Sequence, residues 1–202
     1  MRRTAGLLKR PTDERKGAAR RGLPRLLVFT DPQRTPDLEA AARALPAGAA
    51  LVYRAFGAPD AEAQAKRLLA LVRARRGLLL VGADADLAAS IGAAGVHLPE
   101  RAAFQARRIK ALWPEWLVTA AAHSPRAARR ARTAGADAAV VAAVFPSRSP
   151  SAGRPTGVLR LAAIARAAGL PIYALGGVND LTAGRLRGIG LAGLAAVEGF
   201  RT

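Results

Sequence analysis

The sequence predicts a (β/α)8 TIM barrel, the α/β fold in which eight parallel strands close inside a ring of helices. Three observations support this prediction. Eight short apolar runs alternate with segments of helical periodicity, the repeat is about 22 residues long, and the runs are apolar almost continuously. Strands of that kind, covered by helices on both faces, form parallel sheets. A doubly wound open sheet is the competing architecture.

Each predicted strand is a short apolar run that ends in small or polar residues. The carboxyl ends of parallel barrel strands meet at one rim, so the residues that follow the strands should share a single mouth. The eight runs are Leu26–Asp31, Ala50–Phe56, Leu78–Asp84, Gly95–Pro99, Leu117–Ser124, Ala138–Pro146, Ile172–Gly177 and Leu191–Gly199.

The segments between these runs have the periodicity of amphipathic helices. One segment has apolar residues three and four apart at Ala61, Ala65, Leu68, Leu69 and Val72, and another at Val158, Leu161, Ile164 and Ala165. Three aspartates stand where an N-cap is expected, and three glycines stand where a helix needs a left-handed stop. They are Asp37, Asp60 and Asp180, and Gly92, Gly135 and Gly169.

The final helix of the barrel is expected to be missing or replaced. Predicted strand eight ends near Phe200, and the sequence stops at Thr202. A missing helix would leave an apolar flank between the first and the seventh helix. We therefore expect this flank to be covered by the N-terminal arm or by a second subunit, as in a homodimer.

Residues 1–25 are predicted to be a basic arm that precedes a barrel over residues 26–202. The arm contains nine basic and two acidic residues and little apolar periodicity. We expect it to be poorly ordered or to dock one helical turn around Thr12–Arg21. It lacks the apolar core of a secretory signal, although its composition also fits an organellar transit peptide.

Amino-acid composition excludes several classes of protein. The chain has no cysteine, which excludes disulfide scaffolds and thiolate metal sites and favours a reducing compartment, here the cytoplasm. No apolar run approaches the roughly 20 residues of a membrane span. The net charge of +18 comes from 28 arginines and four lysines against 14 acidic residues. Biased codon usage produces such an arginine and alanine excess, so we do not expect nucleic-acid binding from the charge alone.

The turn after predicted strand seven has the composition of a phosphate cradle. Gly176 and Gly177 allow backbone N–H groups to approach an anion, and a helix is expected to start directly afterwards. In barrels of this class, phosphate is held by the loops after strands seven and eight. A tight strand-to-helix turn without a ligand explains the same glycines equally well.

Several motifs, in register with the predicted strands, resemble one known family. Together they span residues 26–200 in the order seen in the thiamine phosphate synthase and TenI family. The motifs are Phe29-Thr30-Asp31, Asp86-Leu87-Ala88 with the following Gly92–Pro99, His123-Ser124, Ala134–Asp137, Val144–Ser147 and Leu175–Val178.

This resemblance implies a barrel of thiamin biosynthesis. Synthases of the family join a hydroxymethylpyrimidine diphosphate to a thiazole phosphate with magnesium and release pyrophosphate. Positive groups neutralise the departing diphosphate while the thiazole nitrogen attacks the carbon that it leaves. TenI-type members bind thiazole phosphate and isomerise it. A small phosphorylated ligand is therefore the expected partner.

Carried over residue by residue, the catalytic positions are only partly retained. Arg54 matches the arginine of the synthase motif at strand two, but Phe56 replaces its lysine. The magnesium carboxylates of strands three and four are replaced by Gly82-Ala83 and Pro99-Glu100-Arg101. We expect Arg54, Asp84 and Ser147 to be the catalytic candidates. No metal ligand is assigned, although Asp84 and Glu100 could substitute for the missing carboxylates.

The expected phosphate-binding residues follow strands six, seven and eight. They are Gly176, Gly177, Val197, Arg148 and Ser149. Arg148 or Arg154 could supply the charge of the lysine that Pro150 replaces. Ala143 occupies the position of the tautomerase histidine, and Glu198 places a carboxylate beside the expected phosphate.

The sequence leaves three functional hypotheses open. The first is a TenI-like protein that binds a thiazole phosphate or a related small phosphate with weakened or lost synthase chemistry. The second is a diverged but active thiamine phosphate synthase, a transferase. The third is a basic nucleic-acid-binding module that uses the N-terminal arm. The departures at Phe56 and at the magnesium positions favour the first.

Overall fold

Eight parallel strands close into a barrel in the order of the sequence, which confirms the predicted fold class. The structure is a computed structural model, and it describes residues 22–147 and 153–197. Every strand pairs in parallel with its neighbours, and β1 closes the barrel against β8. The strands are β1 Leu26–Phe29, β2 Ala50–Tyr53, β3 Leu78–Gly82, β4 Gly95–Leu98, β5 Leu117–Ala122, β6 Ala138–Val141, β7 Ile172–Ala174 and β8 Gly193–Ala196.

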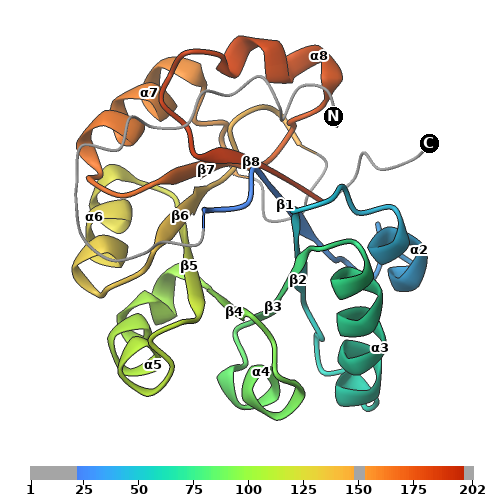
Figure 1. Cartoon of the computed structure of the whole chain (residues 1–202). Helices are drawn as coiled ribbons and strands as arrows, with labels where there is room; N and C mark the ends of the chain where they lie inside the picture. The colour runs from blue at the N-terminus through green and yellow to red at the C-terminus, as the bar shows by residue number, and fades with distance from the viewer. Residues whose placement is uncertain (1–21, 148–152, 198–202) are drawn as a thin grey trace.

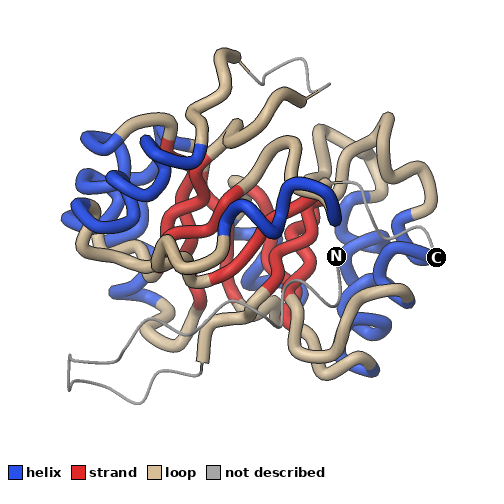
Figure 2. The backbone as a smooth tube through the Cα atoms, turned by 90° about the horizontal axis from the view of Figure 1, so that it is seen from above, coloured by secondary structure: helices blue, strands red, loops and turns tan. Residues whose placement is uncertain are grey.

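The helices form a ring around the strands, as Figure 1 shows along the barrel and Figure 2 shows from the side. Two short 3-10 helices, η1 and η2, extend the connections after β4 and β7. The bounds are α2 Leu38–Arg43, α3 Ala61–Ala74, α4 Ala85–Ile91, η1 Glu100–Gln105, α5 Ala106–Leu112, α6 Pro125–Thr133, α7 Val158–Ala167, α8 Asp180–Ala183 and η2 Gly184–Leu186.

The core divides into two layers because successive strand residues point to opposite faces. One set of alternate residues packs against the helices, including Leu51 and Tyr53 of β2 with Leu68 of α3. The other set fills the barrel interior: Leu27, Phe29, Ala50, Val52, Leu80, Ala138, Val140, Tyr173 and Ala195. Residues that continue the inner series past the strand ends therefore point into the mouth, the rim at the carboxyl ends of the strands.

Most of the predicted helix boundaries are confirmed by local hydrogen bonds. Asp37 caps α2 by accepting from the Ala40 N–H at 2.8 Å, and Gly92 ends α4 in the left-handed conformation with φ of 67°. Asp60 precedes α3, but its carboxylate accepts from the Gln64 side chain instead of a backbone N–H. The prediction for Asp180 was wrong, because Asn179 caps α8 in a capping box with Thr182.

The last residues of the predicted arm are already part of the barrel. The Pro24 carbonyl accepts a hydrogen bond from the Tyr173 hydroxyl, and the Arg25 carbonyl accepts from the Leu194 N–H at 3.0 Å. Residues 1–21, including the predicted helical turn at 12–21, lie outside the described residues. In residues 22–147 and 153–197, no helix follows β8. That the N-terminal arm or a second subunit covers the flank beside β8 stays a prediction.

Gly193 allows the chain to close the barrel at β8. A Cβ atom there would lie 2.4 Å from the Arg25 carbonyl oxygen and 2.6 Å from Tyr173 Cε1. Backbone at that distance cannot move aside without breaking the pairing of β8 with β1. Gly193 is therefore required by packing, unlike Gly184, which has no atom within 4 Å of the same position.

We predict that Gly193→Ala lowers the free energy of unfolding by about 2 kcal/mol or more, because overpacking forces the closing strand outward. Gly184→Ala is the matched control. Gly184 has helical backbone with φ of −58°, so alanine should be neutral or stabilising by up to about 1 kcal/mol. Urea unfolding followed by circular dichroism measures both. Equal stabilities of the two variants would contradict this role of Gly193 in barrel closure.

Candidate functional site

Arg54 is fixed at the mouth by the end of the neighbouring strand. Its side chain continues the inner series of β2, and its Nε donates to the Thr30 carbonyl oxygen at 2.6 Å. A second guanidinium nitrogen donates to Asp31 Oδ2 at 3.2 Å. The Arg54 backbone N–H also donates to the hydroxyl of the buried Thr30 at 2.9 Å. This predicted site residue therefore holds a fixed, half-buried positive charge.

The surroundings of the Arg54 side chain are formed by β3 and by two aromatic rings. A Cβ atom at Gly82 would lie 2.9 Å from Arg54 Cγ, so the missing side chain at Gly82 leaves room for the arginine. The guanidinium carbon lies 5.8 Å from the Phe29 ring centroid and 4.8 Å from that of Phe56. Such cation–π contacts favour a charged guanidinium at this place. Phe56 remains 60% exposed, so much of its ring is open to solvent.

Asp31 joins two arginines into one charged cluster. Its Oδ2 atom lies 3.1 Å from Arg34 and 3.2 Å from Arg54. The hydrogen bond from Arg34 holds the pKa of Asp31 below its ordinary value, against the opposing effect of burial. One carboxylate therefore faces two guanidinium groups at the mouth. Sequence reasoning did not select Arg34, and its position three residues after the strand-one motif was the available signal.

His97 and Thr119 form a neutral polar pair inside the barrel. His97 Nδ1 lies 2.9 Å from Thr119 Oγ1, and the imidazole ring contacts Phe29 edge to face at 4.8 Å. Burial, with a smaller contribution from the positive charge of Arg54, lowers the pKa of His97 to about 3. The imidazole is therefore uncharged at neutral pH. It supports the Phe29 ring without adding charge beside the arginine cluster.

The glycine turn follows β7 at the same rim of the barrel as Arg54. Gly176 and Gly177 have φ of 91° and 65°, and neither N–H donates to any atom of the described residues. A Cβ atom at Gly177 would lie 2.4 Å from the Pro146 carbonyl oxygen, so this turn packs directly against the loop after β6. The unbonded N–H groups are donors that an anion could use.

The structure places the other residues that the sequence singled out around the mouth less completely. Ser147 follows Pro146 in the loop after β6 and is half-buried, and Val197 follows β8 and packs against the interior cluster. The order of strands sets Arg54 on β2 opposite the β6 loop across the mouth. Arg148, Ser149 and Glu198 lie outside the described residues, so the structure does not place these three.

The two candidate carboxylates for magnesium already have other partners. Asp84 caps α4 by accepting from the Leu87 N–H at 2.8 Å. Glu100 Oε2 accepts from the His123 backbone N–H and lies 2.8 Å from the His123 ring, and its Oε1 lies 3.0 Å from Arg130. Burial raises the pKa of Glu100, but the hydrogen bonds from His123 and the charge of Arg130 outweigh this effect. The pKa of Glu100 therefore lies below its ordinary value.

Within the described residues, Asp84 and Glu100 do not form a common site for a magnesium ion. Across residues 22–147 and 153–197, no group of three or more His, Asp or Glu side chains could hold a metal. Hard divalent cations need several oxygen ligands on one site, and here the carboxylates of Asp84 and Glu100 belong to separate local networks. His123, two residues before α6, belongs to the network of Glu100.

The fold and the mouth define a (β/α)8 barrel with a fixed cluster of Asp31, Arg34 and Arg54 at the carboxyl ends of its strands. The sequence matches the family described as thiamine monophosphate synthase over residues 26–200. A thiamine-phosphate synthase from Pyrococcus furiosus is 30% identical, with 86% of this chain and 85% of the relative covered. One from Thiobacillus denitrificans is 36% identical, with 85% of each chain covered.

Solved structures agree with the sequence comparison. The thiamine phosphate pyrophosphorylase from Pyrococcus furiosus superposes with a TM-score of 0.76 at 29% identity, covering 88% of this chain and 87% of that one. The chain therefore belongs to the thiamine monophosphate synthase family, as its motifs indicated. This family acts in thiamine biosynthesis, and its members bind small phosphorylated substrates. In the described part of the chain, no helix has the length and apolarity to span a membrane.

We predict that His97 makes stability depend on pH. The folded chain keeps the imidazole neutral down to a pKa of about 3, whereas the unfolded chain takes up a proton near pH 6.5. The unfolded state thus binds more protons between these values, and the free energy of unfolding falls as pH falls through this window. Between about pH 6.5 and 4.5 the loss from this group should reach about 2 kcal/mol.

Urea unfolding of wild type and His97→Gln at a series of pH values measures this contribution. Glutamine can still bond to Thr119 but takes up no proton, so the variant should lose about 2 kcal/mol less than wild type over the same range. Parallel pH dependences of the two proteins would show that His97 has the same pKa in the folded and the unfolded chain, against the burial described above.

Proposed function

We propose that this chain binds a thiazole phosphate, or a closely related small phosphorylated ring, at the barrel mouth, and that its synthase chemistry is weakened or lost. The observation that supports binding most directly is the fixed guanidinium of Arg54, which shares its mouth with unbonded N–H groups of Gly176 and Gly177. The mouth thus combines cationic and neutral donors around one space. Such donors suit a phosphate monoester.

The half-buried guanidinium of Arg54 supports an anionic ligand. Its side chain is only 29% exposed, and it shares the carboxylate of Asp31 with Arg34. Removing an arginine from water is unfavourable unless its donors are satisfied. A bound phosphate would accept from Arg54 donors that Thr30 and Asp31 leave unused.

The exposed ring of Phe56 supports a planar organic group beside the phosphate. Its ring contacts the Arg54 guanidinium at 4.8 Å and is 60% exposed. A thiazole ring could stack on the remaining aromatic surface. A diphosphate would gain nothing from that surface, because phenylalanine offers no hydrogen-bond donor. The substitution at this position therefore favours a ring over a second phosphate.

The carboxylate networks support the loss of synthase chemistry. Departure of pyrophosphate needs its developing charge to be neutralised. Asp84 caps a helix, Glu100 pairs with Arg130, and Phe56 stands in place of a lysine. Positioning of the thiazole by Arg54 would survive these changes, whereas stabilisation of the leaving group would not.

An active diverged synthase is the second candidate. Relatives of 30% and 36% identity over most of the chain are named thiamine-phosphate synthases, and family membership agrees equally with that activity. In this case Arg34 and Arg54 would neutralise the diphosphate in place of the missing lysine. Magnesium-dependent turnover would then require carboxylates other than those that the described residues bring together.

We predict that Arg54→Gln weakens binding of thiazole phosphate by about tenfold to a hundredfold, because it removes a charged hydrogen bond to the phosphate. Arg166→Gln is the matched control, since Arg166 is exposed on α7 away from the mouth and loses the same charge. Isothermal titration calorimetry measures both. Unchanged affinity in Arg54→Gln, or no binding by wild type at millimolar ligand, would contradict a phosphate site at the mouth.

Synthase activity is tested separately. The pure protein, incubated at high concentration with pyrimidine diphosphate, thiazole phosphate and magnesium, should form no thiamin phosphate above the rate without protein. Detection by fluorescence of the oxidised product gives the required sensitivity. Product that forms with wild type and disappears with Arg54→Gln would establish the active synthase instead.

A further inference from the structure

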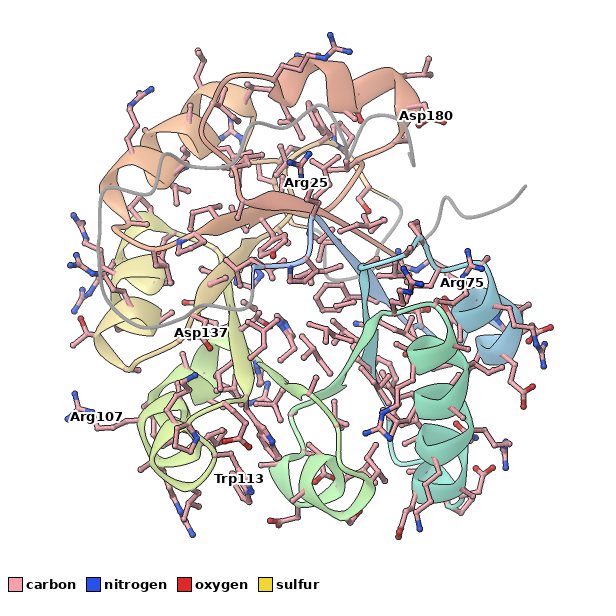
Figure 3. All side chains as sticks on the ribbon, in the orientation of Figure 1. Arg25, Arg75, Arg107, Trp113, Asp137 and Asp180 are labelled. Atoms are coloured by element: carbon pink, nitrogen blue, oxygen red, sulfur yellow. The ribbon has the colours of Figure 1, made fainter. Side chains whose placement is uncertain are left out.

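A second cationic surface lies on the outer flank of the barrel, between neighbouring helices of the ring. A groove of about 700 Å³ separates η1 and α5 from α6, and five of its ten lining residues are arginines. In Figure 1 these helices are neighbours in the ring, and in Figure 3 the labelled Arg107 side chain lies at the outer edge of the molecule between them. The arginines are Arg101, Arg107, Arg126, Arg129 and Arg130.

Helical spacing gathers these arginines onto two facing walls. Residues 126, 129 and 130 are three and four apart, so they share one face of α6, while its alanines face the core. Arg101 and Arg107 flank Phe104 at intervals of three on the opposite wall. The groove is therefore a cationic channel with an aromatic ring in one wall.

One carboxylate faces this set of charges. Glu100 pairs with Arg130 at 3.0 Å and also bonds to His123. The other four arginines have no ion pair with any carboxylate of the described residues, and Arg107 donates one hydrogen bond to the Thr133 carbonyl at 3.3 Å. Like charges held on one helix face repel. A bound polyanion would relieve that repulsion along the whole groove.

Phe104 distinguishes between the polyanions that could bind. Its side chain is 71% exposed, among the largest exposures of an apolar residue in the described chain. An acidic peptide needs cations alone, whereas a nucleic acid strand also offers bases that stack on an exposed aromatic ring and on guanidinium planes. The α6 wall is nine residues long, or about 13 Å, which suits a few nucleotides of one strand.

We propose that this groove binds single-stranded nucleic acid, with phosphates on the arginines of α6 and a base against Phe104. The charge of the whole chain gave no reason to expect this, because composition does not show where arginines gather. The groove lies on the flank, and its lining residues include neither Arg54 nor the Gly176–Gly177 turn. Binding there is therefore independent of the proposed phosphate ligand.

Fluorescence anisotropy of the full chain with a labelled ten-nucleotide oligo(U) tests the proposal. Arg126→Gln/Arg129→Gln should weaken binding about tenfold and reduce the slope of log affinity against log salt by about 1.4, the value for two lost phosphate contacts on a single strand. Phe104→Leu should weaken binding about fivefold or more and leave the slope unchanged, because stacking involves no counterion.

Arg108→Gln/Arg132→Gln is the matched control. Both residues lie on the same two helices, lose the same charge and do not line the groove. This variant should bind within about threefold of wild type, and thiazole phosphate should not displace the oligonucleotide. Equal losses in the two double variants would assign binding to the general charge or the basic arm, and would overturn the proposal.

Two further outcomes would also overturn the proposal. One is no binding of oligo(U) by the wild-type chain at low salt. The other is displacement of the oligonucleotide by an equal charge concentration of a poly-glutamate peptide, with no effect of Phe104→Leu, which would identify the groove as a site for an acidic protein segment. Far-UV circular dichroism of each variant confirms that the exposed substitutions leave the barrel folded.

Discussion

The hydrogen bond from Arg54 Nε to the Thr30 carbonyl is the interaction on which the site depends. It ties the end of β2 to the end of β1 and holds a guanidinium at the mouth, where a free arginine side chain would sample many rotamers. Gly82 leaves room for the Arg54 side chain, and the rings of Phe29 and Phe56 lie against its guanidinium group. The carboxylate of Asp31 offsets part of the free energy needed to bury the guanidinium charge. Preorganisation of this kind makes a charge useful for binding, since no ordering is needed when the ligand arrives.

The barrel could be predicted from the sequence because short apolar runs alternate with segments of helical periodicity. The spacing of Leu68, Leu69 and Val72 is one example of that helical periodicity. Boundaries were harder. Predicted strand eight extended over 191–199, whereas β8 covers Gly193–Ala196. Asn179 and Asp180 both have side chains able to cap a helix, and the backbone conformation, which the sequence does not display, decided for Asn179.

The candidate site was predictable only where one residue in one strand was sufficient. Arg54 could be found because it matches the arginine of the family motif at strand two. The His97–Thr119 pair could not, because its two residues lie 22 positions apart and are brought together by the closed sheet. The position of Asp84 after β3 suggested a metal ligand. In the structure its carboxylate instead accepts from the Leu87 N–H, one of the donors that the first turn of a helix leaves unpaired.

The central claim is that a phosphate monoester lies between Arg54 and the glycine turn. Nuclear magnetic resonance of the 15N-labelled chain during titration with thiazole phosphate tests it directly, because each donor reports its own hydrogen bond. We expect saturable downfield shifts of the Gly176 and Gly177 amide protons and of the Arg54 Nε proton, all with one affinity. Shifts confined to the flank at α5 and α6, with these three resonances unmoved at saturation, would contradict it.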